Sequence, residues 1–220
     1  AISLFNYGHF IERALESVCM QTIASVVELI VVDDSSTDDS VEIVSRFCQN
    51  NRSLIARLWS FHCHVHECNY GLAAARNTGF RLSRAQNVLV LDADNFLLPQ
   101  ACACLLCALE AAPKSVGAVY PVLSVEGHLY QKVANELPWD PNRLRRGNYI
   151  DAMALVRLEA WQSVGGFHHT QGGWEDFDFW CRFVECGLDA LQVPKFLGVY
   201  THHGDSMKNT ETKSRHHELI

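Results

Sequence analysis

Residues 26–37 read Val26-Val27-Glu28-Leu29-Ile30-Val31-Val32-Asp33-Asp34-Ser35-Ser36-Thr37. The first seven residues are almost all apolar and mostly β-branched, which is typical of a strand buried on both faces of a parallel sheet. The hydroxyl residues 35–37 offer N-cap side chains, and Asp38 and Asp39 add negative charge to the first turn of a following helix. We therefore predict a strand over 26–32 and a helix that runs to about Asn50.

Strands and helices alternate in the same way further along the chain. Residues 10–21 place apolar side chains on one face of a helix, and residues 71–83 also look helical. Between that helix and a later one, residues 87–91 predict another buried strand. Repeated strand–helix units predict an α/β fold, a single Rossmann-like domain whose central, mostly parallel sheet is flanked by helices.

The second half of the chain is less regular. We predict a helix over residues 175–186 that ends at Gly187, because glycine readily takes the left-handed conformation that follows many helices. A strand over 191–193 is expected to stop at Pro194.

Composition limits the classes of protein to which the chain can belong. The 220 residues are 48% apolar and 20% charged, which is typical of one globular domain with a sizeable core. The net charge is −7 and no basic stripe is present, which argues against a nucleic-acid partner. The nine cysteines lie in apolar segments, which favours reduced thiols and a cytoplasmic location. The abrupt apolar start suggests a piece of a longer chain.

Polar side chains gather where the predicted strands end. They are Asn6, Asp33-Asp34 and Asp92-Ala93-Asp94, and the start of the 175–186 helix is a less direct fourth place. Because ligands in open α/β sheets bind beyond the carboxyl ends of the strands, we expect these groups to meet at one edge. Convergence of this kind predicts a binding or catalytic site.

Asp92-Ala93-Asp94 comes directly after the buried run 88–91. Two carboxylates one residue apart on an extended segment point to the same side. Together they suit Mg²⁺ or Mn²⁺, which fill their other positions with phosphate and water. The alternative is turn chemistry, since Asp and Asn both favour strand ends. The buried strand before them favours the metal, because ionised groups at a core edge are costly unless paired or ligated.

Other candidate residues each have a structural alternative. Asp34 can accept an N–H of a nucleobase, while its neighbours cap a helix. Arg76 follows the small-residue run after Gly71 and can meet a phosphate, or the run can simply pack closely. Asp176 can act as a general base or can stabilise the start of its helix. His203 can complete a metal shell or lie on the surface.

Two further clusters attract attention in the sequence. Cys102, Cys104 and Cys107 lie within one predicted helix, where they cannot all face one metal, so we interpret them as core packing. Residues 62–66 alternate histidine with other residues, so three histidines can share one face of a strand. This second cluster is either a zinc-binding site or a surface feature that binds zinc adventitiously.

Taken in order, these motifs resemble family 2 glycosyltransferases over nearly the whole chain. The matching segments are Phe5-Asn6-Tyr7-Gly8, Val31-Val32-Asp33-Asp34-Ser35-Ser36-Thr37-Asp38, Asn69-Tyr70-Gly71-Leu72-Ala73-Ala74-Ala75-Arg76-Asn77, Leu91-Asp92-Ala93-Asp94, Gly147-Asn148-Tyr149-Ile150-Asp151-Ala152, Gly165-Gly166-Phe167, Gly173-Trp174-Glu175-Asp176 and Tyr200…His203…Ser206. Any one segment is weak evidence, but their shared order is strong.

The resemblance implies a GT-A fold, a nucleotide-diphosphate sugar as donor and a bound Mn²⁺ or Mg²⁺. It implies that Asp34 contacts the base, that Asp92 contacts the ribose or the metal, and that Asp94 ligates the metal through this DxD motif. Asp176 would be the catalytic base and His203 a further metal ligand. The full set of implied donor contacts is Ser3, Asn6, Asp34, Ser35, Gly71, Arg76, Asp92 and Ala93, with Trp174 and Glu175 on the acceptor.

The implied activity is a metal-dependent sugar transfer, with inversion, from a UDP-sugar by preference. The acceptor would be a saccharide or a lipid-linked saccharide, in the synthesis of cell-surface polysaccharide or glycan. Residues 1–125 would bind the donor and residues 126–220 the acceptor, at the inner face of the membrane or free in the cytoplasm. The alternatives are a sugar-phosphate nucleotidyltransferase and a nucleotide-sugar-binding domain without turnover.

Overall fold

The structure is a computed structural model that describes residues 1–127, 132–170 and 172–204. In these ranges the strands are β1 (Ile2–Leu4), β2 (Glu28–Asp33), β3 (Ser60–Val65), β4 (Asn87–Leu89), β5 (Leu91–Asp92), β6 (Phe96–Leu97), β7 (Val116–Glu126), β8 (Lys132–Ala134), β9 (Leu155–Arg157) and β10 (Asp189–Thr201). The helices are α1 (Gly8–Cys19), η1 (Ala24–Val26), α2 (Ser40–Asn50), α3 (Arg52–Ile55), α4 (Leu72–Leu82), α5 (Ala101–Ala111), α6 (Pro141–Leu144), α7 (Leu158–Ser163) and α8 (Glu175–Glu185). Within the described part of the chain, none of these helices has the length and apolar character needed to cross a membrane.

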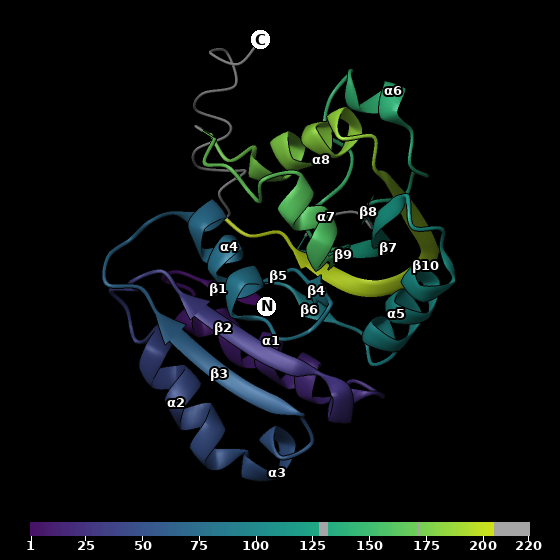
Figure 1. The fold of residues 1–220 in the computed structure, drawn as a ribbon. Helices are drawn as coiled ribbons and strands as arrows, with labels where there is room; N and C mark the ends of the chain where they lie inside the picture. The colour runs from purple at the N-terminus through teal and green to yellow at the C-terminus, as the bar shows by residue number, and fades with distance from the viewer. Residues whose placement is uncertain (128–131, 171, 205–220) are drawn as a thin grey trace.

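The first sheet is parallel throughout, with the strand order β3-β2-β1-β5. Successive residues of β2 face opposite sides of it. Leu29 and Val31 join the core formed with α1 and α2, whereas Ile30 and Val32 pack with Ala75 of α4 on the other side. The helices therefore cover both faces (Figure 1), which confirms the predicted α/β fold with a parallel sheet.

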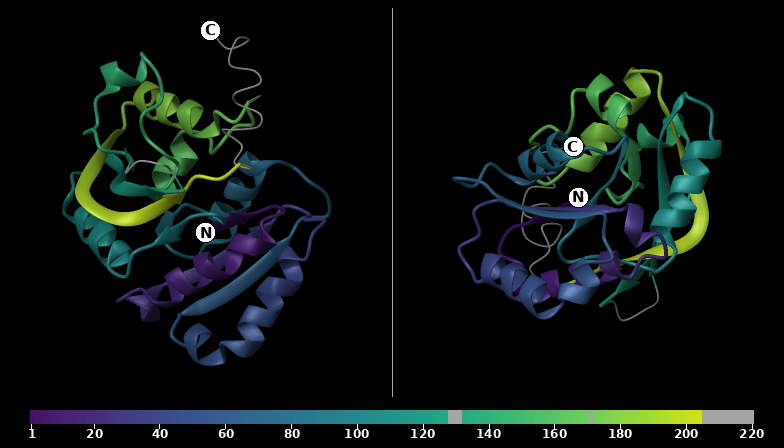
Figure 2. Two further views of the ribbon diagram at one scale, coloured as in Figure 1. Left: turned by 180° about the vertical axis from the view of Figure 1, so that it is seen from behind. Right: turned by 60° about the horizontal axis from the view of Figure 1, so that its bottom comes forward.

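The second sheet is mixed, with the order β4-β9-β7-β10-β6, and β8 pairs with β7. β7 and β10 run parallel, while β9 is antiparallel to both β4 and β7. β10 is long and strongly curved (Figure 2). A second core, which includes Phe179, Trp180 and Phe183 of α8, lies against this sheet. The second sheet therefore combines β7, β8, β9 and β10 with the short strands β4 and β6 from the first half of the chain.

The single strand predicted over residues 87–91 is wrong in one respect. The chain crosses between the two sheets within it, so that β4 pairs with β9 and β5 pairs with β1. Val90 lies at the crossing and donates its N–H to Ala154 O at 3.0 Å, and Leu91 donates to Ala1 O at 3.0 Å. An apolar run does not show which sheet will take each of its residues.

The strand predicted to stop at Pro194 in fact continues to Thr201. Its register against β7 shifts between Val193 and Phe196, so Pro194 lies in a bulge. A bulge leaves one residue of the strand without a ladder partner, and proline, which has no N–H, is tolerated at such a place.

The helix boundaries are largely as predicted, with one error. The helix predicted over 71–83 is α4, and that predicted over 175–186 is α8, followed by Gly187 with φ 69°. Residues 35–37 do not cap α2, which begins only at Ser40. Instead the carboxylate of Asp38 accepts the Ser40 N–H at 3.0 Å.

Gln21 joins two helices from inside the core. Its side chain is fully buried, and its Nε2 donates to Ser17 O at 3.0 Å and to Leu98 O at 2.8 Å. Its Oε1 accepts the Cys102 N–H at 2.9 Å, at the start of α5. One amide therefore satisfies backbone groups that neither helix can satisfy itself.

We predict that Gln21→Leu lowers the free energy of unfolding by about 2–4 kcal/mol, because it leaves buried backbone groups without partners. Chemical denaturation monitored by circular dichroism would measure the loss. The matched control is Gln49→Leu on the exposed surface of α2, which should change stability by less than about 0.5 kcal/mol. Equal effects of the two substitutions would contradict the role of Gln21.

Candidate active site

The predicted polar groups meet at the carboxyl edge of the parallel sheet. β1, β2 and β5 are neighbours, and Asn6, Asp33-Asp34 and Asp92 lie at or just beyond their ends. Ser3 is paired in register with Asp92, and its carbonyl accepts the N–H of buried Ala93 at 3.1 Å. The convergence that the sequence predicts is therefore present in the structure.

The loop after β1 is bonded to the loop after β2 through Asn6. Asn6 has φ 54° and donates its backbone N–H to Ser36 Oγ at 3.0 Å. Its Oδ1 accepts the N–H groups of Thr37 and Asp38 at 2.7 and 3.2 Å. Ser35, in the loop after β2, has φ 62°, a backbone conformation that few residues other than glycine adopt. Strained backbone of this kind is often found at functional sites.

Asp34 is buried and accepts three hydrogen bonds. Its Oδ1 lies 2.6 Å from His66 Nδ1 and 2.9 Å from the Tyr70 N, and its Oδ2 lies 2.7 Å from the Gly71 N. Gly71 has φ 90° and precedes α4, so the carboxylate fixes the entry to that helix. A base contact by Asp34 stays a prediction. The contact of His66 with this carboxylate could not be predicted from the sequence, because the two residues are 32 positions apart.

Arg76 and Asp92 form a buried ion pair. Nη2 of Arg76 lies 3.1 and 2.9 Å from the two carboxylate oxygens of Asp92, and the arginine is only 5% exposed. Burial alone would lower the pKa of Arg76, but the charges of Asp92 and then Asp176 raise it. Arg76 Nε has no partner among the described residues. The arginine is thus held by Asp92, and its contact with a phosphate stays a prediction.

Asp94 lies deeper, beside His203. Its Oδ2 is 3.1 Å from His203 Nε2, while its buried Oδ1 has no partner in the described ranges. Burial and then the charge of Asp92 raise the pKa of Asp94 to about 7. A carboxylate that is costly to ionise and has an unused oxygen fits a cation. Carboxylate and imidazole ligands together suit Mn²⁺ better than they suit Mg²⁺.

The described residues do not by themselves complete a metal site. In residues 1–127, 132–170 and 172–204, no three His, Cys, Asp or Glu side chains are placed to hold an ion. This also applies to the cluster of His62, His64 and His66, whose third member is bonded to Asp34 instead. A divalent ion at Asp94 would therefore draw further ligands from a phosphate or water.

Asp176 lies in the first turn of α8 and has a donor on each oxygen. Asn148 Nδ2 donates to Oδ2 at 2.9 Å, and the Phe177 N–H donates to Oδ1 at 2.8 Å. Burial raises the pKa of Asp176, whereas the charge of Arg76 and these hydrogen bonds oppose the rise. Asn148 also accepts the Ile150 N–H at 3.2 Å, which fixes the orientation of its amide.

The neighbours of Asp176 were predicted to meet the acceptor. Glu175 is 4% exposed, and its Oε1 lies 4.0 Å from His169 Nδ1. Trp174 has a buried Nε1 with no partner among the described residues. Ser206, the last residue of the predicted motifs, lies outside the described residues, so only Tyr200 and His203 of that segment can be placed.

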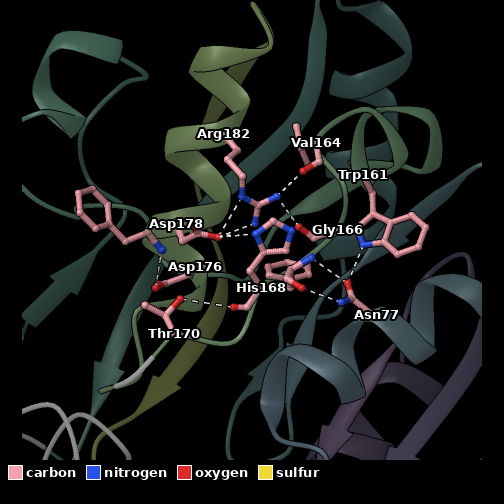
Figure 3. Close-up of polar contacts among 11 residues, drawn as sticks. Asn77, Trp161, Val164, Gly166, His168, Thr170, Asp176, Asp178 and Arg182 are labelled. Atoms are coloured by element: carbon pink, nitrogen blue, oxygen red, sulfur yellow. Dashed lines mark hydrogen bonds and ion pairs between the residues drawn. The ribbon is translucent and has the colours of Figure 1, made fainter.

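The loop before α8 is held by two side chains (Figure 3). Arg182 of α8 donates to the carbonyls of Val164 and Gly166 and forms an ion pair with Asp178 at 2.6 Å. Asn77 of α4 donates to Phe167 O at 2.7 Å, and its Oδ1 accepts the N–H of Phe167 at 2.8 Å and of the Trp161 indole at 3.0 Å. These contacts join α8, and with it Asp176, to α4, which carries Arg76.

Asp151 is a member of the site that the sequence did not single out. Burial, followed by the charges of Asp92 and Asp176, raises its pKa to about 7. Its carboxylate accepts the Met153 N–H at 2.8 Å, and its own N–H donates to Asn135 Oδ1 at 2.7 Å. Asp151 lies in segment 147–152, one of the matching motifs, but only the fold shows that it lies beside the other acids.

Comparison with known proteins decides the family. Residues 1–164 match the family described as glycosyl transferase family 2. The chain belongs to this family. This is the family that the motifs predicted, one of glycosyltransferases and not of nucleotidyltransferases.

The most similar relatives include polysaccharide synthases. The chondroitin synthase of Escherichia coli is 27% identical over an alignment of 222 positions, which covers 98% of this chain and 31% of the relative. The chondroitin synthase of Pasteurella multocida (strain Pm70) is 24% identical over an alignment of 229 positions, which covers 100% of this chain and 22% of the relative. The glycosyltransferase thus spans about a fifth to a third of the length of these curated relatives.

Solved structures share the fold at low sequence identity. A complex of S. aureus TarS 1-349 with UDP-GlcNAc has a TM-score of 0.74 at 16% identity, covering 95% of this chain and 60% of that one. The mannosyltransferase PcManGT of Pyrobaculum calidifontis, solved with GDP-Man and Mn²⁺, has a TM-score of 0.68 at 22% identity, covering 94% and 57%. The likeness confirms the predicted GT-A fold.

The raised pKa of Asp151 predicts a pH-dependent stability. The pKa of its carboxyl is about 7 in the folded chain, compared with an ordinary value of 3.8 in the unfolded chain, so the folded chain binds the proton more tightly. The folded state therefore loses stability as the pH rises through this window. Asp151→Asn removes this carboxyl and should therefore raise the free energy of unfolding relative to the wild type. We predict that this increase is about 2 kcal/mol larger at pH 8 than at pH 5.5.

Urea unfolding in metal-free buffer at the two pH values would measure this difference. The control is Asp39→Asn, an exposed residue at the N-cap of α2, where asparagine serves equally well. Its effect on stability should be the same at both pH values. If Asp151→Asn also shows no change with pH, the carboxyl is not buried as described.

Proposed function

We propose that the glycosyltransferase moves a sugar from a nucleotide-diphosphate sugar, with UDP as the favoured nucleotide, to a saccharide or lipid-linked acceptor. The observation that carries this proposal is the meeting of Asp94, Asp92 and Asp176 around Arg76 at one edge of the parallel sheet. The edge offers a place for a cation, a buried counter-charge and an oriented base. These are the parts that displacement of a diphosphate requires.

The proposed donor agrees with the ligands named for similar structures. TarS was solved with UDP-GlcNAc and PcManGT with GDP-Man and Mn²⁺. Asp34 suits a base that presents an N–H, because a carboxylate can only accept hydrogen bonds. Uracil and guanine both present such a group. Ser3, Asn6, Ser35 and Ala93 lie at or next to the same strand ends, and Gly71 donates its N–H to Asp34. We include all five in the proposed donor site.

Asp94 would hold Mn²⁺ or Mg²⁺, with His203 beside it and Asp92 toward the ribose or the metal. The unused Oδ1 of Asp94 supports this assignment. When bound, the ion supplies positive charge that stabilises the departing diphosphate. Asp92 has a second task in this arrangement, because its carboxylate already neutralises Arg76.

Asp176 is the proposed general base. It takes the proton of an acceptor hydroxyl, whose oxygen forms a bond to the anomeric carbon while the bond from that carbon to the diphosphate oxygen breaks. One such displacement inverts the anomeric centre. Asn148 and the Phe177 N–H hold the carboxylate in place for this step. Trp174 and Glu175, next to it in the chain, would contact the acceptor.

The biological setting is part of the proposal. The relatives named chondroitin synthase support a role in the synthesis of a cell-surface polysaccharide or glycan. A cytoplasmic location at the inner face of a membrane would give access to a lipid-linked acceptor. Residues 1–125 would then bind the donor and residues 126–220 the acceptor, as the positions of Asp34 and Asp176 suggest.

Donor binding can be tested by thermal unfolding with UDP-sugars and GDP-mannose, each with and without Mn²⁺. A ligand at 100 times its Kd adds about 2.7 kcal/mol of stability, so the preferred donor should give the largest rise in Tm. We expect Mn²⁺ to increase that rise and Asp94→Asn to abolish the increase. The proposal is wrong if no nucleotide diphosphate sugar shifts the Tm under any metal condition.

The assignment of the base predicts that Asp176→Asn reduces kcat by about 10²- to 10⁴-fold and leaves donor affinity within a few-fold of the wild type. Release of the nucleotide with acceptor present would measure turnover, and calorimetry would measure donor binding. Glu185→Gln, an exposed residue on the same helix, is the control and should retain full activity. Retained turnover in Asp176→Asn would assign the base elsewhere.

A further inference from the structure

His66 lies directly after β3 and is buried between Asp34 and α4. It is 8% exposed, and both nitrogens of its ring have partners. Nδ1 lies 2.6 Å from Asp34 Oδ1, and Nε2 lies 2.9 Å from Thr78 Oγ1. A buried imidazole with two hydrogen bonds has a fixed orientation, so His66 cannot turn without breaking one of them.

Both ring nitrogens of His66 are held by neighbouring groups. A carboxylate can only accept, so Nδ1 donates to Asp34 Oδ1. On the other side of the ring, Thr78 Oγ1 lies within hydrogen-bond distance of Nε2 and also accepts from Arg81 Nη2 at 3.0 Å. Thr78 and Arg81 belong to α4, so the imidazole joins Asp34 to that helix.

The carboxylate of Asp34 has one acceptor position left. Oδ1 of Asp34 takes hydrogen bonds from His66 and from the Tyr70 N–H, whereas Oδ2 takes one from the Gly71 N–H. A carboxylate has about four acceptor positions, two on each oxygen. The remaining position is therefore on Oδ2, and the hydrogen bond from His66 to Oδ1 decides which way it faces.

We propose that His66 is a positioning residue of the donor site, where its imidazole holds Asp34 so that Oδ2 accepts an N–H of the donor's nucleobase. This rests on the proposed function, because it requires a nucleotide donor. His66 acts through Asp34 and through the Tyr70–Gly71 backbone at the entry to α4. Its loss should weaken binding of the nucleotide while leaving the transfer step itself largely unchanged.

The neighbouring histidines provide a matched comparison. His62 and His64 lie in β3, four and two residues before His66. The ring centroids of His64 and His66 are 5.4 Å apart. His62 is exposed, and its ring is 6.4 Å from that of His64. A substitution at His62 therefore changes a histidine of the same strand without touching Asp34.

The test compares His66→Phe, His66→Asn and Thr78→Val with His62→Phe. Calorimetry with UDP and with GDP in the presence of Mn²⁺ gives Kd, and steady-state assays separate donor KM from kcat. We expect His66→Phe to raise Kd and KM at least about tenfold, because Asp34, a charged acceptor, loses one hydrogen bond. The value of kcat should stay within about threefold of the wild type. His66→Asn, whose amide nitrogen replaces Nδ1, should recover most of the affinity, and His62→Phe should match the wild type.

Thr78→Val keeps the shape of the side chain and removes only its hydroxyl, so it tests the same hydrogen-bonded contacts of His66 if His66→Phe does not fold. We expect an intermediate loss of affinity. Folded His66→Phe or Thr78→Val protein with wild-type Kd would overturn the positioning role alone. Wild-type protein that binds neither nucleotide would overturn the proposed function and this role with it.

Discussion

The guanidinium of Arg76 is the buried positive charge on which the acidic site depends. It pairs directly with Asp92, and its field lowers the pKa of Asp94, Asp151, Glu175 and Asp176 against the rise that burial causes. Without it, several carboxylates would lie in one poorly solvated place with only each other's charge. Isolated buried charges are costly, so the site can gather acids only because this cation lies among them.

That dependence gives the helix α4 a structural role beyond its packing. α4 carries Arg76, and its preceding turn is bonded to Asp34. The next residue on the helix, Asn77, holds the loop that leads to Asp176. Small residues at the start of α4 let it lie close against the parallel sheet, where Ala75 is almost fully buried beside Ile30 and Val32. The helix thus relates the donor side of the site to the acceptor side.

Much of the first half could be predicted from the sequence, because its signals are local. Buried β-branched runs followed by acids gave the strand ends, and the order of the strands brought Asp34 and Asp92 to one edge. The long-range partners could not be found in that way. Nothing in the local sequence links Arg76 to Asp92, His66 to Asp34 or Asn148 to Asp176, since each pair is separated by a strand, a helix or both. The path of residues 87–91 was missed for the same reason.

Val90 has a mechanical consequence for the whole molecule. Its own N–H bonds to the carbonyl of Ala154, directly before β9 of one sheet, while the next amide, that of Leu91, bonds to the carbonyl of Ala1, directly before β1 of the other. Because peptide groups are planar, only the two backbone torsions of Val90 lie between these bonds. The two sheets therefore cannot slide or rotate past one another at this point without breaking one of them. Asp92 and Asp94 follow within four residues, so the carboxylates of the site lie next to the point at which the two sheets are joined.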